Sequence, residues 1–222
     1  MSKKKHKVSA KYHTDPSSEY EPGSRGKVLK NLLGISSVRK MEDAELKAYM
    51  FAERAFLAQY SLDHKFTVAD INTIHHIFLG HIYSWAGTYR TVNLTKGGFP
   101  FATAMAIPRA MQEFERTILQ PNTPCRGRTL QQVAALIAGV HAELLLIHPY
   151  REGNGRTARL LATLMAYQAG MPGIDFWFIG SRGKEFQGYV RAIQHAIHTN
   201  YKPMQSIVER GLRRALRLRA RR

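Results

Sequence analysis

The chain has 222 residues, enough for one domain with a sizeable core, and carries a formal net charge of +17. Its single cysteine, Cys125, excludes an intramolecular disulfide and indicates a reducing compartment, so we expect a cytoplasmic protein. The basic N-terminus is not followed by the apolar segment of a secretory signal peptide, and we expect no membrane span.

Most of the excess positive charge lies at the two ends of the chain. Residues 1–11 hold five lysines and residues 210–222 hold seven arginines, and neither segment contains an acid; without these twelve cations, +5 of the +17 remains. Such clusters bind nucleic acid or anionic membranes in some proteins and are solvated tails in others. Nucleic-acid binding through these basic termini therefore stays open as an alternative function.

The predicted domain organisation follows composition. Residues 1–25 are polar and rich in Pro, Gly and Ser, which predicts a disordered N-terminal segment; a folded domain at 26–208 and an Arg-rich helix end or tail at 209–222 follow. A helix from Asp43 to Tyr60 is predicted by the apolar spacing of Leu46, Tyr49, Met50, Phe56, Leu57 and Tyr60. Thr67 and Asp70 resemble a capping box that opens a second helix, with its inward residues at Ile71, Ile74 and Phe78.

Later elements alternate between extended and helical patterns. Residues 88–101 favour extended chain with a Gly97-Gly98 turn, which predicts a β-hairpin. Further helices are expected after Pro108, over 133–147, from about 156 to a C-terminal cap at Gly170, over 186–197 and over 204–215. His75, His76 and His81 lack a usual metal-ligand spacing, which favours core or surface roles over a metal site.

The loop between two of these helices carries the chemistry. Residues 148–159 read His-Pro-Tyr-Arg-Glu-Gly-Asn-Gly-Arg-Thr-Ala-Arg. Pro149 disfavours helical dihedrals at His148, so the preceding helix should end there, where its partial negative charge would raise the basicity of the imidazole. Gly153 and Gly155 can adopt positive φ, and successive backbone N–H groups could then form an anion-binding nest at the start of the next helix.

Charged side chains complete the expected phosphate site. Arg156 and Arg159 are three residues apart, so they share one helix face and are suitable donors to phosphate oxygens. Glu152 lies beside the nest and could hold a Mg²⁺ ion that bridges phosphates. A base, a metal-binding carboxylate and anion donors are the parts that transfer of a phosphate-bearing group requires. An ordinary polar loop is the alternative, and this combination disfavours it.

These residues resemble the signature of Fic-domain proteins, His-x-Phe-x-(Asp/Glu)-Gly-Asn-Gly-Arg-x-x-Arg, with Tyr150 at the usual Phe position. Residues 82–90 are similar to the family's segment before its flap, and residues 95–101 resemble the flap itself. The resemblance covers roughly residues 30–205. It implies an all-α, Fic-type helical bundle with a small β-hairpin flap over the active site.

The resemblance also implies an activity, transfer of AMP from ATP to a Tyr, Thr or Ser hydroxyl of a target protein. In that reading His148 is the general base, Glu152 binds Mg²⁺, and phosphate oxygens are held by Gly153, Asn154, Gly155, Arg156 and Arg159. The family's phosphate-transferring branch has Lys at position 155, so Gly155 favours AMP transfer. Lys96, Gly97 and Gly98 would form the target-docking flap. Tyr189 and Tyr201 could line an adenine pocket, although core roles suit them at least as well.

Regulation and partners are inferred from the same resemblance. Many family members are inhibited by a (Ser/Thr)-x-x-x-Glu-(Gly/Asn) helix whose Glu pairs with the second motif arginine, here Arg159. The chain has no full match, since Pro22 interrupts the nearest candidate. We therefore expect a small antitoxin that supplies this helix, and a type II topoisomerase subunit as a candidate target. A secreted effector is the alternative suggested by the Arg-rich C-terminus.

Overall fold

The computed structural model describes residues 19–96 and 98–221. This part of the chain forms seven α-helices and one two-stranded antiparallel sheet. The helices are α1 (Val38–Gln59), α2 (Val68–Leu79), α3 (Ile107–Phe114), α4 (Leu130–Ile147), α5 (Asn154–Gln168), α6 (Gly183–His195) and α7 (Lys202–Arg219). The strands are β1 (Thr95–Lys96) and β2 (Phe99–Pro100). The all-α class with a small hairpin is thus confirmed.

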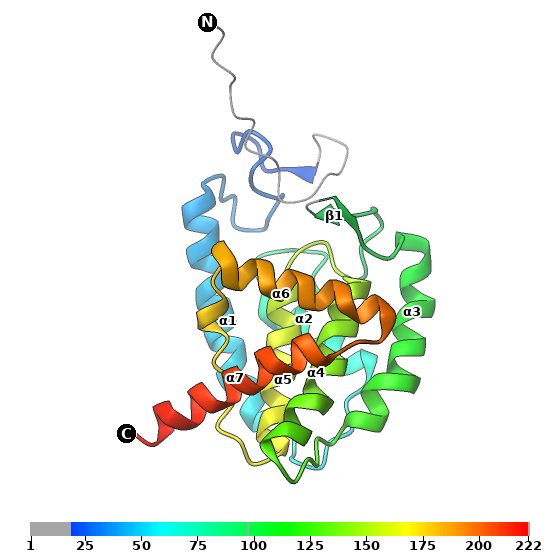
Figure 1. The fold of residues 1–222 in the computed structure, drawn as a ribbon. Helices are drawn as coiled ribbons and strands as arrows, with labels where there is room; N and C mark the ends of the chain where they lie inside the picture. Colours follow the sequence, from blue (N-terminus) through cyan, green and yellow to red (C-terminus); the bar gives the residue numbers. More distant parts are fainter. Residues whose placement is uncertain (1–18, 97, 222) are drawn as a thin grey trace, which may run out of the picture.

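Helix α4 forms the centre of the bundle. It packs against α5 and α7, and α1, α2, α3 and α6 complete the bundle around this core (Figure 1). Among the described residues, one helix, α4, has the length and the apolar composition that a membrane span needs. This corrects the expectation that the chain contains no such segment. However, 61% of α4 is buried inside the fold, as in the core helix of a folded domain.

Helix α1 begins five residues before the predicted start, and it buries a different face. Its buried side chains are Met41, Glu45, Ala48, Ala52 and Phe56, which recur at the spacing of one helical stripe. Leu46 and Met50, which the sequence pattern suggested as part of the apolar face, are 40% and 49% exposed. Two of these five residues are alanines, whose small side chains suit close packing against the neighbouring helices α2 and α5.

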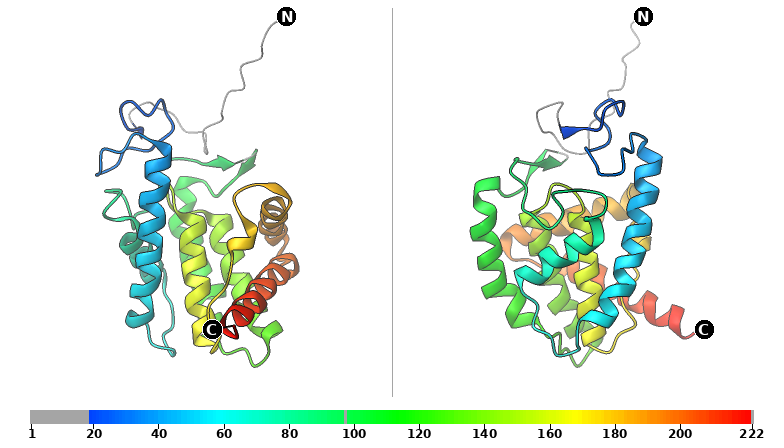
Figure 2. Two further views of the ribbon diagram at one scale, coloured as in Figure 1. Left: turned by 90° about the vertical axis from the view of Figure 1, so that its left-hand side faces the viewer. Right: turned by 180° about the vertical axis from the view of Figure 1, so that it is seen from behind.

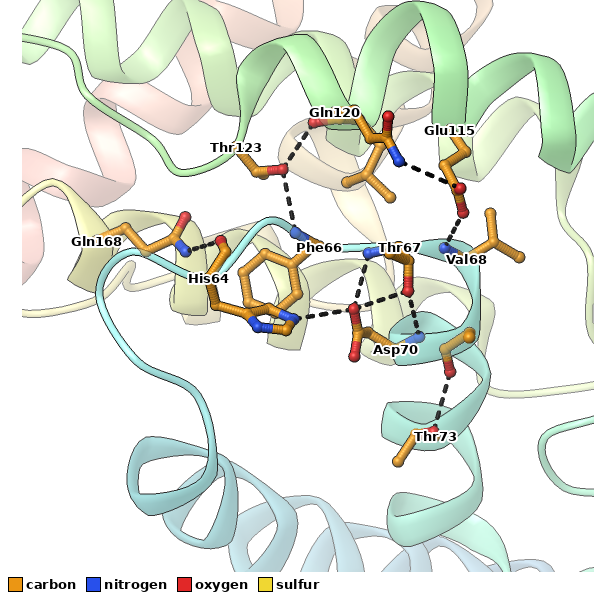
Figure 3. Close-up of polar contacts among 12 residues, drawn as sticks. His64, Phe66, Thr67, Val68, Asp70, Thr73, Glu115, Gln120, Thr123 and Gln168 are labelled. Carbon is orange, nitrogen blue, oxygen red and sulfur yellow. Dashed lines mark hydrogen bonds and ion pairs between the residues drawn. The ribbon is translucent and has the colours of Figure 1, made fainter.

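The capping box of α2 forms as predicted. The Thr67 hydroxyl accepts a hydrogen bond from the Asp70 backbone N–H, and the Asp70 carboxylate accepts one from the Thr67 backbone N–H (Figure 3). The Val68 N–H donates to the Glu115 carboxylate, in the π-helical turn that follows α3. This network fixes the start of α2 against α3, and the far end of α2 then lies at the α4–α5 loop.

The hairpin is shorter than predicted. Only Thr95–Pro100 and Lys96–Phe99 pair, and residues 88–94 lie outside the ladder. The reason is that the segment before β1 bonds to another part of the chain: the Arg90 N–H donates to the Pro149 carbonyl. The hairpin and the N-terminal residues from 19 onward lie at the same end of the bundle (Figure 1).

The two ends of the described chain both contact the folded domain. Residues 1–18 of the predicted disordered segment lie outside the described residues, but residues 19–25 pack on the fold, with Ser24 buried and Glu19 paired to Arg151 at 2.7 Å. Helix α7 continues to bury side chains past residue 208, at Gly211, Leu212 and Ala215. The C-terminal end of α7 projects from the bundle (Figure 2), and residues 216–221 are exposed.

Candidate active site

The predicted loop joins α4 to α5, and we call residues 148–153 the motif loop. Helix α4 ends at Ile147, and His148 takes a left-handed conformation with φ 54°, so the helix stops where Pro149 predicted. Gly153 has φ 83° and precedes the first residue of α5. A Cβ at Gly153 would lie 2.6 Å from a Leu79 methyl group, and the positive φ strains any other residue, so both features favour glycine here.

The His148 ring is positioned by a stacking contact on its face and by a hydrogen bond at one ring nitrogen. It stacks on Phe101 with 3.8 Å between ring centroids and 14° between planes. Its Nδ1 lies 3.1 Å from the Leu145 carbonyl oxygen. A carbonyl can only accept, so Nδ1 carries the proton and Nε2 is the basic nitrogen of the neutral ring.

Burial lowers the pKa of His148 to about 3, against the opposing effect of the Leu145 hydrogen bond. The expectation that the helix terminus makes this imidazole more basic was therefore wrong. The carbonyl at the end of α4 does favour the charged ring, but removal of water from a side chain that is 6% exposed has the larger effect. His148 is thus neutral in the described conformation, which is the form that can accept a proton.

Arg90 supports the motif loop from the segment before the hairpin. Its side chain is 4% exposed, and its guanidinium donates to the carbonyls of His148 at 2.8 Å and Val92 at 2.6 Å. The same guanidinium also donates to the Ala102 carbonyl, on the other side of the hairpin. Arg90 therefore ties both ends of the hairpin to the residue that carries the base.

Asn154 and Gly155 differ from the predicted nest. Both lie inside the first turn of α5 with helical dihedrals, so Gly153 alone of the three has positive φ. The Asn154 amide binds back to Tyr150, accepting from its N–H at 2.8 Å and donating to its carbonyl at 2.7 Å. The side chain thus braces the loop, and anion binding here would rely on the backbone N–H groups at the N-terminus of α5.

Gly155 has no structural reason to be glycine. Its backbone is helical, and a Cβ at this position would meet no atom within 4 Å. Glycine in a helix costs about 1 kcal/mol relative to alanine. An open position directly above the first turn of α5 leaves space for a ligand to approach the backbone.

The charged side chains of the motif lie together. A Glu152 carboxylate oxygen accepts from the Gly153 N–H at 2.9 Å and lies 3.4 Å from the Arg156 guanidinium. Arg156 also forms an ion pair with Glu45 of α1 at 2.8 Å. Both ion pairs of Arg156 are with carboxylates, those of Glu45 and Glu152. Phosphate oxygens that bind Arg156 would therefore replace carboxylate oxygens that already contact its guanidinium.

Arg159 lies one turn further along α5. Its guanidinium is 5.9 Å from the centre of the Tyr189 ring, and its buried Nε has no hydrogen-bond partner among the described residues. A buried donor without an acceptor is costly, so this nitrogen fits a site whose acceptor comes from outside the described chain.

A cavity of about 430 Å³ opens beside both arginines. Its wall combines three carboxylates of α1 with the two guanidinium groups and with aromatic side chains of the segment after α5. The lining includes Glu42, Glu45, Glu53, Arg156, Arg159, Phe176 and Trp177. This volume is in the range of small-molecule sites.

Tyr189 packs in the core beside Arg159, and Tyr201 contacts Glu143 of α4. The Tyr189 hydroxyl lies 2.7 Å from Nε2 of His141, and its ring is 4% exposed in the core. The Tyr201 hydroxyl donates to Glu143 at 2.6 Å. Neither lines the cavity beside the arginines, where Tyr49, Phe176 and Trp177 supply the aromatic surface; sequence reasoning gave none of these three a role in the site. Residues 176–178 read Phe-Trp-Phe, an apolar aromatic run after the motif helix that could have marked it.

Of the predicted flap residues, Lys96 and Gly98 lie in the hairpin, and Gly97 lies outside the described residues. The Lys96 ammonium is 5.3 Å from the centre of the Phe186 ring of α6, and Gly98 is exposed with φ 80°. Phe101 directly follows β2 and stacks on His148. The hairpin is therefore adjacent to the base, as a flap that presents a hydroxyl would need to be.

A Mg²⁺ site is compatible with these side chains only in part. No group of three or more His, Cys, Asp or Glu that could hold a metal occurs in the part of the chain that the structure describes. Mg²⁺ is commonly held by one or two carboxylates together with substrate phosphates. Glu152, which is 8% exposed beside the N-terminus of α5, fits the role of the single protein carboxylate.

Comparison with known proteins agrees with the geometry. The Fic/DOC family model matches residues 65–166. A probable protein adenylyltransferase of Sinorhizobium fredii is 30% identical over 149 residues, which cover 67% of this chain and 74% of that protein. A protein adenylyltransferase of Bartonella schoenbuchensis is 29% identical over 202 residues, which cover 89% of this chain but 39% of that protein.

Solved structures show the same fold. The N-terminal Fic domain of a putative cell filamentation protein from Bartonella quintana, with bound ADP, matches with a TM-score of 0.68 and 27% identity. The match covers 87% of this chain and 93% of that one. The motif at residues 148–159, the bundle that presents it and these relatives together show that the chain belongs to the Fic/DOC family.

Proposed function

We propose that this protein transfers AMP from ATP to a hydroxyl group of a target protein. The observation that carries the proposal is the buried, neutral His148, whose Nε2 is the basic nitrogen and whose loop leads directly into α5, where the two arginines lie. The adenylyltransferase names of the relatives and the ADP bound to the structural neighbour support a nucleotide substrate. The open space at Gly155 is consistent with a nucleotide phosphate close to the α5 backbone.

In this reaction His148 accepts the proton of the target hydroxyl as its oxygen attacks the α-phosphorus. The new O–P bond forms as the bond from the α-phosphorus to the bridging oxygen breaks, and pyrophosphate leaves. Backbone N–H groups of the first turn of α5 stabilise the charge on the phosphoryl oxygens, and Arg156 and Arg159 hold the remaining phosphates. A Mg²⁺ ion held by Glu152 would neutralise phosphate charge.

The desolvated His148 is a weak base on its own. An anionic nucleotide beside it favours the protonated ring, so nucleotide binding would raise the pKa of His148 from about 3 toward the working pH. The base would then become effective when ATP is in place.

The test is incubation of the purified protein with Mg²⁺, a bacterial lysate and ATP labelled on the α-phosphate, beside a His148→Ala control. A labelled protein band that the control loses, and that ATP labelled on the γ-phosphate does not reproduce, supports AMP transfer. Label from the γ-phosphate instead would show phosphate transfer and overturn the proposal.

We further propose that a separate antitoxin controls this site by placing a carboxylate on Arg159. The unpartnered Nε of Arg159 and the absence of the inhibitory motif from the sequence support this. Expression of the chain alone should then arrest bacterial growth in a manner that requires His148. Undisturbed growth together with full activity of the purified chain would contradict an antitoxin-controlled toxin.

The target protein, the cellular location and the role of the basic termini are further proposals. A type II topoisomerase subunit is the first target to test, by incubating the purified subunit with labelled ATP. We place the activity in the cytoplasm of the producing cell; translocation into another cell is the alternative, which a reporter fused to the chain would reveal. Nucleic-acid binding through the termini predicts retention on DNA that falls steeply with salt and is lost when residues 1–11 and 210–222 are removed.

A further inference from the structure

His75, near the end of α2, lies in the centre of three segments that are far apart in the sequence. Its ring is 0% exposed. Nδ1 lies 2.8 Å from the Gly87 N–H, and Nε2 lies 3.0 Å from the Glu152 carbonyl oxygen. The ring stacks on Tyr150 of the motif loop, with 3.8 Å between centroids and 12° between planes.

These partners determine the tautomer of His75. The Gly87 N–H can only donate, so Nδ1 is the unprotonated acceptor. The Glu152 carbonyl can only accept, so Nε2 carries the proton and donates. Burial lowers the pKa of His75 to about 4, so the ring stays neutral and both hydrogen bonds persist near pH 7.

The bond to the Glu152 carbonyl fixes the orientation of one peptide group. In a planar trans peptide the C=O and the following N–H point in opposite directions. Because the Glu152 carbonyl points at His75, the Gly153 N–H points away from α2. It donates to the Glu152 carboxylate at 2.9 Å, on the side where Arg156 lies. The carboxylate there occupies the place of an anion at the start of α5.

Because residue 153 is glycine, the 152–153 peptide could also adopt the flipped orientation. A contact with another residue must therefore select the observed one. Glycine at φ 83° has few barriers to rotation of the adjoining peptide. A side chain at this position would also lie 3.2 Å from Nε2 of His75, so the imidazole and the glycine form one closely packed unit.

We propose that His75 is a positioning residue that aims the Gly153 N–H at the phosphate group of the nucleotide. It does so by fixing the 152–153 peptide, while its second nitrogen holds Gly87 in the segment that leads to the hairpin. This inference rests on the proposed nucleotide-transfer function for its catalytic consequence. Its structural consequence, an ordered 152–153 peptide, does not depend on that function.

Two amide side chains separate the two hydrogen bonds. In His75→Gln the side-chain nitrogen reaches the position of the imidazole Nε2, so the bond to the Glu152 carbonyl is retained. In His75→Asn the side-chain oxygen reaches the position of Nδ1, so the bond to Gly87 is retained and the one to Glu152 is lost. His76→Gln is the matched control, because the hydrogen bond of His76 runs from Nδ1 to the Ala86 carbonyl oxygen at 3.0 Å, outside the motif loop.

Two measurements decide between positioning and a structural role. The first is kcat and KM for AMP transfer: His75→Asn should lower kcat by about 100-fold, the scale of a misplaced catalytic geometry. His75→Gln and His76→Gln should stay within about threefold of the wild type. Equal losses of kcat in the Asn and Gln variants, or a loss in the His76 control, would overturn the proposal.

The second measurement is hydrogen–deuterium exchange of the peptide covering residues 149–155, with and without a non-hydrolysable ATP analogue. His75→Asn should speed exchange in this peptide and abolish the protection that the analogue gives, whereas His75→Gln should preserve both. A uniform increase of exchange across the helices in both variants would show a purely structural role and overturn the proposal. If the wild type transfers no AMP, the proposed function fails, and exchange alone still judges His75.

Discussion

Acid should unfold this protein through three buried histidines. His75, His141 and His148 are 0%, 1% and 6% exposed, and burial lowers their pKa values to about 4, 3 and 3. In the unfolded chain each returns to about 6.5. The unfolded state therefore binds more protons below pH 6.5, and the free energy of unfolding falls as the pH falls from 6.5 toward the folded-state values.

The magnitude follows from the size of that window. Each histidine costs about 1.4 kcal/mol per pH unit once the pH lies between its two pKa values. Between pH 7.5 and pH 5 this amounts to about 2 kcal/mol for each residue and about 6 kcal/mol for all three. A small domain is stable by about 5–15 kcal/mol, so the effect is large enough to approach unfolding. The raised pKa values of Glu53 and Glu143 oppose it only near the ordinary carboxyl range.

The assay is urea denaturation at pH 7.5 and pH 5, in salt high enough to screen the general repulsion of a +17 chain. His141→Gln provides the internal check, because His141 lies in the core between the Ala158 carbonyl and the Tyr189 hydroxyl. The variant starts from a lower stability but should lose about a third less of it between the two pH values. The same free energy of unfolding at both pH values, or an unchanged pH dependence in the variant, would refute the reasoning.

Three further predictions concern the motif loop and its support. Gly153→Ala should destabilise the fold by about 1–3 kcal/mol because Gly153 has a positive φ and is closely packed. Gly155→Ala should raise the melting temperature slightly and weaken the binding of an ATP analogue, measured by calorimetry. Equal melting temperatures for the two variants would contradict this. Tyr150→Phe removes a 2.7 Å hydrogen bond to Asn72 and should cost about 1 kcal/mol in urea denaturation, with kcat unchanged. Arg90→Lys should cost several kcal/mol and lower kcat, since an ammonium cannot serve the carbonyls that the guanidinium fork reaches; a stable, fully active variant would show that these bonds are dispensable.

The sequence predicted the boundaries of the motif loop better than its interior. Pro149 correctly placed the end of α4 at His148, and Gly153 takes the expected left-handed conformation. Gly155 does not, because α5 begins at Asn154. Either glycine could precede the helix as far as local propensity is concerned. The choice is made by packing, since Gly153 is the one enclosed by Leu79 and His75.

Periodicity failed where both faces of an element are apolar. In α1 the larger residues Leu46 and Met50 suggested the buried face, yet the face that packs carries alanines and Phe56. Close approach of helices favours small side chains there, which a pattern weighted by hydrophobicity does not detect. The hairpin is short for a different reason: residues 88–94 have strand-like composition, but the Arg90 N–H donates to the Pro149 carbonyl in the motif loop and the Asn93 side chain accepts from the Ala104 N–H, so these residues do not extend the β1–β2 ladder.

The supporting residues of the site could not be found from the motif, because they act on its backbone. Arg90 donates to the main-chain carbonyls of Ile147 and His148, and His75 donates to that of Glu152. Every residue type has a carbonyl, so such contacts leave no pattern in the residues that they hold. The donors themselves carry the only trace. A buried arginine 58 positions before the base, and a buried histidine 77 before the carboxylate, are costly unless all their polar groups are satisfied. In this fold the carbonyls of the motif loop accept these hydrogen bonds. The loop therefore needs Arg90 and His75 to keep its geometry, and the two side chains need the loop in order to be buried without unsatisfied polar groups.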